Sequence, residues 1–412
     1  MTDRSPQRTR ARRRAATATS AVAISGLVIT YLAYALLAPL PAVSATLNPI
    51  PTTSTAEATV SLPGYGASAI GAVDDTQIFA ASDLDTPRPI ASITKVITAL
   101  VVLDSRPIAA SETGELLTLT AADARLRDRY VAMGGSVASA PIGLIISQRQ
   151  VIELMMVTSA NNYAESLAVW AFGSVDAYLL EARRWLDSRG LTTITVADTT
   201  GFSPGNTASP RALLALGRIA LDDPIVSSAA ALPEVTVAGV GTYPNRNRII
   251  GVDGVTGLKT GTLDEAGACL LFTASHEING ETIAVVGVVL GGPDHRQLAA
   301  DVRTLLSSIR DDYHAIQVIT EGQLVATYDA PWGEQVRLDA AESVETLVWG
   351  HVNARSSFTA PPLYVGIDSA SPPLTVRVAG ETVHIALEFD GRFEGPDLAW
   401  RISQPIAELL NR

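Results

Sequence analysis

Ser92 and Lys95 form the first pair of residues whose types and spacing are suited to chemistry. Residues three apart on a helix share a face, so the amine of Lys95 can approach the hydroxyl of Ser92. A buried amine beside another cation loses its proton readily and can then take the serine proton, which activates the hydroxyl as a nucleophile. Taken alone, the pattern fits a capping serine followed by a surface lysine equally well.

Two further short motifs lie downstream. The motif Ser159–Asn161 (Ser-Ala-Asn) follows an apolar helical segment and offers a second hydroxyl for proton relay and an amide for holding a substrate carbonyl. The motif Lys259–Thr262 (Lys-Thr-Gly-Thr) places a lysine and two hydroxyls on a predicted strand, where they suit a carboxylate lying beside that strand. Each motif alone also fits a structural role, because serine and asparagine favour turns and lysine is common on edge strands.

The three motifs together, in this order, are far more specific than any one of them. The serine of the second motif stands 67 residues after Ser92, and Lys259 stands 100 residues further on. The arrangement resembles the serine-type D-alanyl-D-alanine carboxypeptidases, the low-molecular-mass penicillin-binding proteins of peptidase family S11. Flanking sequences that share the resemblance are Pro89–Ala99, Asn245–Asn247 and Gly257–Gly267. The likeness covers about residues 62 to 312, with a weaker similarity in residues 321–333.

The resemblance implies a mixed α/β catalytic domain of the β-lactamase/transpeptidase type and an acyl-serine mechanism without metal or cofactor. Ser92 would attack the penultimate carbonyl of a peptidoglycan stem peptide ending in D-Ala-D-Ala, with Lys95 as the base and Ser159 as a proton relay. N–H groups of Ser92 and Thr262 would form the oxyanion hole. β-Lactam antibiotics would acylate the same serine. The implied substrate-binding residues are Asn161, Lys259, Thr260, Gly261 and Thr262.

Other activities on the same fold stay open. A D,D-endopeptidase or a transpeptidase differs in its acceptor and in access to the groove. Class A β-lactamases typically have the pattern Glu-x-x-x-Asn between the second and third motifs. In this chain Glu165, Glu181 and Glu234 have no Asn four residues further on, which disfavours a β-lactamase. A non-catalytic, membrane-anchored penicillin-binding scaffold is disfavoured because all three motifs are intact. The chain departs from the family at Ala160, where Gly is common, and at Ala212, where Asp is common.

Three other patterns are set aside. Residues 201–205 (Gly-Phe-Ser-Pro-Gly) match the Gly-x-Ser-x-Gly nucleophile elbow, but Pro204 has no N–H for an oxyanion hole and a turn follows it. Residues 64–69 resemble a dinucleotide-binding fingerprint but precede a strand instead of following one. Cys269 lies in an apolar run and is expected to be a core residue.

Composition narrows the class of protein. The 412-residue chain has one Cys, and all five His lie beyond residue 275, so neither a zinc nor an iron–sulfur site is expected. The net charge of −12 argues against nucleic-acid binding. Apolar residues make up 47% of the chain, which disfavours disorder, and the length suggests two or three domains.

The amino terminus predicts a membrane anchor. Residues 1–14 hold six Arg and one acid, and residues 15–38 carry no charge. As a helix the uncharged stretch rises about 36 Å, enough to cross a hydrocarbon core of about 30 Å. Basic residues stay on the cytoplasmic side, which places the rest of the chain outside the cell membrane. A cleaved signal peptide, with Val43–Ala45 as the cleavage site, is the alternative, which the length of the apolar run disfavours.

The remaining chain divides into three predicted parts. Residues 39–61, rich in Pro, Ser and Thr, are expected to be an extended extracytoplasmic linker. Residues 62–312 are the predicted catalytic domain, and residues 313–412 are a small β-rich domain whose end, 397–412, is a poor copy of the amphipathic carboxy-terminal anchor of some family members. Helices are predicted over 92–103, 148–157, 176–188, 211–221 and 299–309. Strands are predicted over 67–73, 76–81, 268–274, 282–290, 323–327, 335–338, 374–378 and 383–389.

Overall fold

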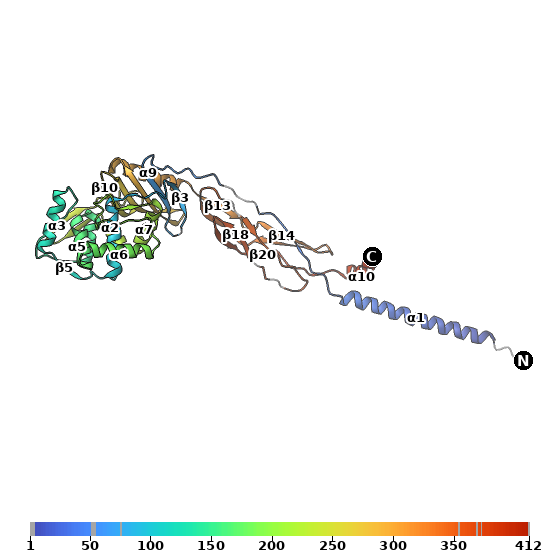
Figure 1. Ribbon diagram of the computed structural model, residues 1–412. Coiled ribbons are helices and arrows are strands. Elements are labelled where there is room, and N and C mark those ends of the chain that lie inside the picture. The colour runs from blue at the N-terminus through green and yellow to red at the C-terminus, as the bar shows by residue number, and fades with distance from the viewer. Residues whose placement is uncertain are drawn as a thin grey trace. The chain divides into compact units, whose positions relative to one another are not determined.

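The computed structural model describes residues 5–50, 55–74, 76–352, 355–367, 370–371 and 373–410. Within them the chain folds into two compact units (Figure 1). One unit comprises residues 57–313. The other combines residues 1–56 with residues 314–412.

The 57–313 unit is built on a five-stranded antiparallel sheet. Its strands are β2 (Ala67–Ala72), β3 (Ile78–Ser82), β10 (Val255–Leu263), β11 (Gly267–Ile278) and β12 (Glu281–Gly292). Their spatial order is β10-β11-β12-β2-β3, so the predicted hairpin β2–β3 is confirmed at one edge and β10 forms the other edge. Asp75, in the sequence between these two strands, lies outside the described residues. Lys259 on β10 faces Leu271 on β11, and the third predicted motif therefore lies on an edge strand.

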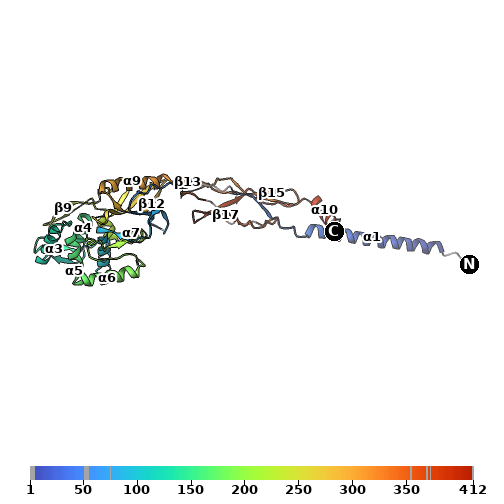
Figure 2. The same cartoon turned by 45° about the horizontal axis from the view of Figure 1, so that its top comes forward.

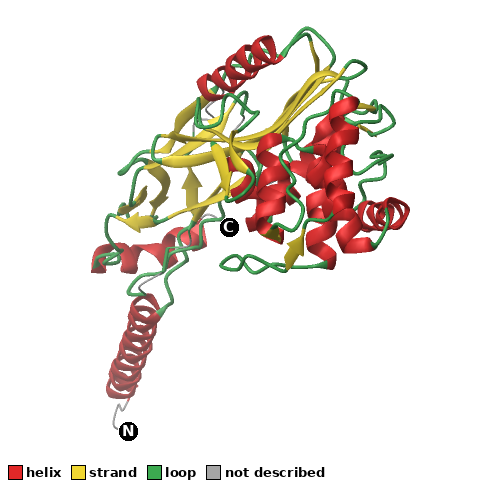
Figure 3. Ribbon diagram, turned by 90° about the vertical axis from the view of Figure 1, so that its left-hand side faces the viewer, coloured by secondary structure: helices red, strands yellow, loops and turns green. Residues whose placement is uncertain are grey.

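Helices cover both faces of this sheet (Figures 2 and 3). On one face lies α9 (His295–Asp311), and on the other lies α7 (Pro210–Asp222). Close packing of α7 depends on Gly217, where a Cβ would come within 2.5 Å of Val286 Cγ2 on β12. Cys269 on β11 is fully buried, which confirms the prediction that it is a core residue.

A largely helical part lies beside the sheet. Its helices are the 3₁₀ turn η1 (Ala91–Ile93), α2 (Thr94–Ser105), α3 (Ala121–Ala132), α4 (Gln148–Thr158), α5 (Asn161–Phe172), α6 (Val175–Ser188) and α8 (Pro224–Ala231). Three short strand pairs connect them: β4 (Arg88–Pro89) with β7 (Thr207–Ala208), β5 (Leu116–Thr118) with β6 (Ile145–Ser147), and β8 (Glu234–Val237) with β9 (Gly241–Pro244).

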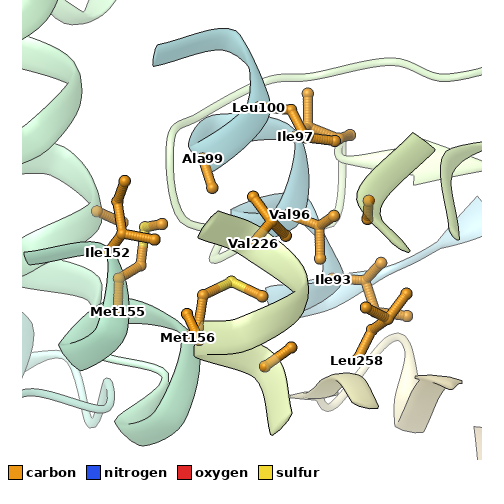
Figure 4. Packing of buried hydrophobic residues seen from close by; sticks show 14 of the residues in the cluster. Ile93, Val96, Ile97, Ala99, Leu100, Ile152, Met155, Met156, Val226 and Leu258 are labelled. Atoms are coloured by element: carbon orange, nitrogen blue, oxygen red, sulfur yellow. The ribbon is translucent and has the colours of Figure 1, made fainter. Parts of the chain in front are cut away.

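Helix α2, which carries Lys95, runs through the centre of this part. Its residues 94–103 are all buried. Figure 4 shows its apolar side chains packing against those of α4 and α8. The labelled side chains include Val96, Ile97, Ala99, Leu100, Ile152, Met155, Met156 and Val226. An amine on this helix is therefore held away from bulk water.

Local capping signals predicted the starts of two helices. Ser147 and Gln150 form a capping box at the start of α4, and Ser209 caps α7 with Pro210 in its first turn. The predicted helix over 92–103 differs, because Ser92 lies in the 3₁₀ turn and the α-helix begins at Thr94. Helix α3 was not predicted because it has no apolar stripe, with Tyr130 its one buried residue.

The other unit contains the long helix α1 (Ser5–Leu37) and a β-rich module. The module's strands are β1 (Ala45–Leu47), β13 (Tyr313–Ile319), β14 (Leu324–Asp329), β15 (Gln335–Ala340), β16 (Val344–Trp349), β17 (Arg355–Ser357), β18 (Leu374–Val378), β19 (Glu381–Ile385) and β20 (Leu387–Phe389). The segment predicted as an extended linker contributes β1, which pairs antiparallel with β14. Backbone hydrogen bonding along β14 thus orders part of a stretch that has no apolar period of its own.

Two ends of the chain meet in this second unit. Helix α10 (Leu398–Leu410) packs on α1, where Arg401 Nη1 donates a hydrogen bond to the carbonyl of Leu36 at 2.8 Å. Trp400 packs edge-to-face on Trp332 of the β-rich module. Within α1, the stretch Arg14–Leu37 is long and apolar enough to cross a membrane.

The helical core should be sensitive to cavities. Leu154 on α4 is fully buried, whereas the side chain of Leu180 on α6 is 64% exposed. We expect Leu154→Ala to lower the free energy of unfolding by about 2–5 kcal/mol, and Leu180→Ala to change it by less than about 0.5 kcal/mol. Urea unfolding of the full chain in detergent, followed by circular dichroism, measures both. Equal losses in the two variants would contradict this account of the core.

Candidate active site

A cleft lies where the sheet edge β10 meets the helical part. Five of the eight residues predicted for the site line it, and the remaining three, Lys95, Asn161 and Lys259, are buried and hydrogen bonded within the same cluster. Residues lining the cleft are Ser92, Ser136, Ser159, Arg246, Arg248, Thr260, Gly261, Thr262 and His295. The fold therefore brings together three motifs that are separated by 67 and 100 residues in the sequence.

The amine of Lys95 is completely buried and has three oxygen partners. Its Nζ lies 2.9 Å from Ser92 Oγ, 2.6 Å from Asn161 Oδ1 and 2.6 Å from the carbonyl oxygen of Thr200. A neutral amine has two N–H donors and one lone pair. Because the amide and carbonyl oxygens only accept hydrogen bonds, they take both donors, and the lone pair then faces the serine hydroxyl.

Burial also favours the neutral form of this amine. Desolvation is the largest influence on the pKa of Lys95, and the nearby charge of Lys259 acts in the same direction. The carboxylate of Asp198 opposes both, yet the pKa stays well below its ordinary value. Lys95 is therefore suited to accept a proton under conditions where an exposed lysine is fully charged.

Ser92 follows a residue with a strained backbone. Ala91 has a φ of +46°, in the left-handed region that favours glycine. On the opposite side, a Cβ on Gly261 would lie 2.9 Å from the carbonyl oxygen of Ile90 and 3.1 Å from the amide nitrogen of Ser92. The absence of a side chain at Gly261 thus keeps the space between β10 and the serine amide open.

The second serine links the other two motifs. Ser159 ends α4 in the left-handed conformation, with a φ of +61°. Lys259 Nζ donates to Ser159 Oγ at 3.1 Å and to the carbonyl oxygen of Thr260 at 3.0 Å. Burial, with a contribution from Arg246, lowers the pKa of Lys259 to about 7. Hydrogen bonds thus join Ser92, Lys95 and Asn161 in one group, and Ser159 and Lys259 in a second.

A loop that the motifs did not reveal supports Lys95. The carboxylate of Asp198 accepts hydrogen bonds from the backbone N–H groups of Thr200, Gly201 and Ser203, each at 2.6 Å. It also accepts one from Asn206 Nδ2 at 3.1 Å. Burial of Asp198 opposes its ionisation, but the hydrogen bonds outweigh burial and hold its pKa below the usual range. This network fixes the peptide whose carbonyl accepts from Lys95.

The same loop lies directly against the serine turn. A Cβ on Gly201, which has a φ of +80°, would come within 1.8 Å of the carbonyl oxygen of Ala91 and 2.9 Å of Ser92 N. Residues 201–205, which match the nucleophile-elbow pattern, therefore pack beside the turn that carries the predicted nucleophile. An aspartate two residues before Thr200 is a local signal for such a hydrogen-bonded turn.

Sequence reasoning also missed four cleft residues, namely Ser136, Arg246, Arg248 and His295. Arg246 is held by a turn in which its backbone N–H donates to the carbonyl of Val157 at 3.0 Å. The flank Asn245–Asn247 contributed to the family resemblance, but no role was assigned to its arginine. Nothing in the sequence around His295 pointed to the cleft, because only packing of α9 on the sheet brings it there.

The fold is that of the serine D,D-transpeptidases. The solved structure of a DD-transpeptidase from Streptomyces superposes with a TM-score of 0.53 at 21% identity, covering 61% of this chain and 98% of the Streptomyces chain. Residues 58–293, more than half of the chain, match the family described as D-alanyl-D-alanine carboxypeptidase, peptidase S11. The chain belongs to this family.

Two curated relatives are similar in sequence. A D-alanyl-D-alanine endopeptidase of Pseudomonas aeruginosa is 31% identical over 205 residues, which cover 45% of this chain and 59% of the relative. A D-alanyl-D-alanine carboxypeptidase of Escherichia coli is 26% identical over 235 residues, covering 56% of this chain and 57% of the relative. The chain thus spans less than two thirds of the length of these two relatives.

Loss of the Asp198 carboxylate should impair the site more than it impairs the fold. In Asp198→Asn, one carboxylate oxygen is replaced by an N–H₂ group, which cannot accept hydrogen bonds from the backbone N–H groups of the loop. The loop should therefore shift and move the Thr200 carbonyl away from Lys95. We expect the acylation rate with a penicillin to fall by roughly 10²-fold, while Asp187→Asn, at an exposed position, should leave the rate unchanged. Stopped-flow acylation measures both rates. Wild-type acylation by Asp198→Asn would contradict the supporting role.

Proposed function

We propose that the protein is a serine D,D-carboxypeptidase that removes the terminal D-Ala from peptidoglycan stem peptides through an acyl-serine intermediate. The observation that carries this proposal is the buried amine of Lys95, which lies 2.9 Å from Ser92 Oγ with its other two partners both acceptors. Membership of the D-alanyl-D-alanine carboxypeptidase family supports the substrate class.

In the proposed reaction each of the three motifs has its own role. Lys95 takes the proton of Ser92 as its oxygen attacks the penultimate carbonyl, and the N–H groups of Ser92 and Thr262 stabilise the oxyanion. Ser159 relays a proton to the departing D-Ala amine. Water then hydrolyses the acyl-serine, which releases the shortened peptide and restores the serine.

The terminal carboxylate would bind at β10. Lys259, Thr260 and Thr262 supply an amine and two hydroxyls there, and Arg246 adds a charge that the motif does not contain. A β-lactam has a carboxylate near its reactive carbonyl and would occupy the same positions. We therefore propose that β-lactams acylate Ser92 and inhibit the enzyme.

Endopeptidase activity is the second candidate. It is favoured by the Pseudomonas aeruginosa relative, which is named an endopeptidase and is 31% identical. In that reaction the leaving group is the amine of a neighbouring stem peptide instead of free D-Ala. Incubation with a purified pentapeptide and with a cross-linked muropeptide dimer separates the two activities by the product that forms.

A β-lactamase activity has less support. It needs a carboxylate that activates water beside the acyl-serine. Glu165, on α5 beyond Asn161, instead forms an ion pair with Arg129 and accepts a hydrogen bond from Tyr130 Oη at 2.6 Å. Those contacts join α3 to α5 and give this carboxylate a structural role.

We also propose that α1 anchors the protein in the cell membrane, with the 57–313 unit on the extracytoplasmic side. Only 6% of the most apolar window of α1 is buried, so this helix is not a core helix of the part of the chain that the structure describes. The arginines that precede this stretch favour a cytoplasmic amino terminus. Peptidoglycan lies outside the membrane, which is where this orientation places the cleft.

Replacement of the nucleophile tests the enzyme directly. We expect the wild-type protein to form a stable adduct with a fluorescent penicillin and to release D-Ala from a D-Ala-D-Ala peptide, and Ser92→Ala to do neither. Gel fluorescence and a D-Ala assay measure the two results. Ser203→Ala, in the dismissed Gly-x-Ser-x-Gly pattern, is the matched control and should keep both activities. Rapid loss of the adduct with hydrolysed drug would indicate a β-lactamase, and no adduct at all would indicate a scaffold.

The pH dependence of acylation tests the role of Lys95. Because its pKa is far below the ordinary value, acylation by a penicillin methyl ester should be fast at neutral pH and should fall only when acid protonates the amine. Lys95→Arg stays protonated throughout and should lose about 10²–10⁴-fold in rate. An acidic limb near pH 10 in the wild-type protein would show that Lys95 is an ordinary charged lysine and refute its role as base.

A further inference from the structure

One residue of the cleft belongs to none of the three motifs and touches the third. His295 is the first residue of α9, and its Nε2 lies 2.6 Å from Oγ1 of Thr262. Thr262 is the last hydroxyl of the Lys259–Thr262 motif, and both residues line the cleft. This contact joins the far face of the sheet, where α9 packs, to the place where the substrate carboxylate is proposed to bind.

Because of this contact, the Thr262 hydroxyl either donates its hydrogen to His295 or accepts a hydrogen bond from it. A hydroxyl has a single hydrogen to donate. If the His295 Nε2 atom carries no proton, Thr262 donates that hydrogen to the ring and can offer the carboxylate only lone pairs. If Nε2 carries a proton, the ring donates to Thr262 Oγ1, and the hydroxyl hydrogen is free for the carboxylate. The state of the ring thus decides whether Thr262 attracts or repels an anion.

Burial and the charges facing this ring lower the pKa of His295. Burial and the charge of Lys259 on β10 lower the pKa of His295, Asp294 at the start of α9 raises it, and Arg246 lowers it. Arg248 lines the same cleft. The pKa lies below its usual value, so the empty cleft holds a largely neutral ring at neutral pH. A bound carboxylate adds negative charge and favours the protonated ring.

We propose that His295 is a positioning residue for carboxylate recognition: it donates from Nε2 to Thr262 Oγ1, turns the threonine hydroxyl toward the substrate carboxylate, and strengthens binding of that carboxylate when the ring is protonated. This rests on the proposed D,D-peptidase function, because it assigns the hydroxyl's partner as the terminal carboxylate. It makes recognition of the carboxylate depend on pH in a window that the nucleophile and its base do not set.

The experiment compares two probes that differ in one group. Benzylpenicillin carries the carboxylate, and its methyl ester does not. The second-order acylation rate constants of the full-length protein in detergent are measured for both probes from pH 5 to pH 8. Protonation of Lys95 slows both reactions equally, so the ratio of acid to ester reports carboxylate recognition alone.

For the wild-type protein we expect the ratio to fall about fivefold as the pH rises through the titration of His295, which lies below the usual range of a histidine. The reason is that a charge-assisted hydrogen bond is about twice as strong as a neutral one. A second fall is expected near pH 7, where Lys259 loses its proton. His295→Gln can still donate to Thr262 but does not titrate, so the first fall should disappear and the second should remain. His295→Leu neither donates to nor accepts from the Thr262 hydroxyl, so it should also lose the first fall and keep the second.

His276→Gln is the matched control. His276 is also partly buried with a lowered pKa, but it lies on β11 and does not line the cleft. Its variant should keep both falls of the ratio. Circular dichroism spectra that match the wild-type spectrum show that the His295 variants are folded.

The outcomes separate this inference from the function on which it rests. Failure of the wild-type protein to react with either probe refutes the proposed function. Acylation by both probes with a ratio that does not change below pH 6.5, or that changes identically in His295→Gln, refutes the role of His295 and leaves the proposed function intact.

Discussion

Much of this structure follows from burying one amine. The ammonium group of a lysine is costly to remove from water, and Lys95 is removed from it completely. The cost is limited by losing the proton and by giving the remaining N–H groups to two acceptors, Asn161 and the Thr200 carbonyl. Both acceptors must be supplied by other parts of the chain. The helical core, the second motif and the 198–206 loop are thus tied to the chemistry of a single side chain.

The supports around this amine are themselves under constraint. Ala91 and Ser159 adopt left-handed backbone conformations, which non-glycine residues occupy only when the surrounding structure imposes them. Gly201 and Gly261 approach the Ser92 turn from two sides, and a methyl group at either would meet backbone atoms. The packing that buries the core therefore also sets the position of the serine relative to its neighbours. Asp198 holds the loop that carries one of those neighbours through six donors.

The two ends of the cleft differ in their electrostatic character. At one end burial favours the neutral form of a lysine, which suits it to accept a proton. At the other end, Arg246 and Arg248 carry positive charge beside Lys259 and His295, whose pKa values are lowered, in a protein whose net charge is −12. The charge of Lys259 lowers the pKa of Lys95, so the end of the cleft proposed to bind the carboxylate also favours the neutral form of the proposed base.

The sequence by itself was sufficient for the fold class, the helix caps at Ser147 and Ser209, and the set of eight candidate residues, because caps, apolar periods and motif spacings are local properties of the chain. It missed the strand β1, the 3₁₀ turn at Ser92, the Asp198 loop and the cleft residue His295. Those features depend on contacts between segments far apart in the chain: β1 needs β14, and His295 reaches Thr262 only after α9 packs on the sheet. Which residues have the chemistry is thus encoded locally, whereas which of them are neutral, charged or hydrogen bonded to one another was decided by burial in the tertiary structure.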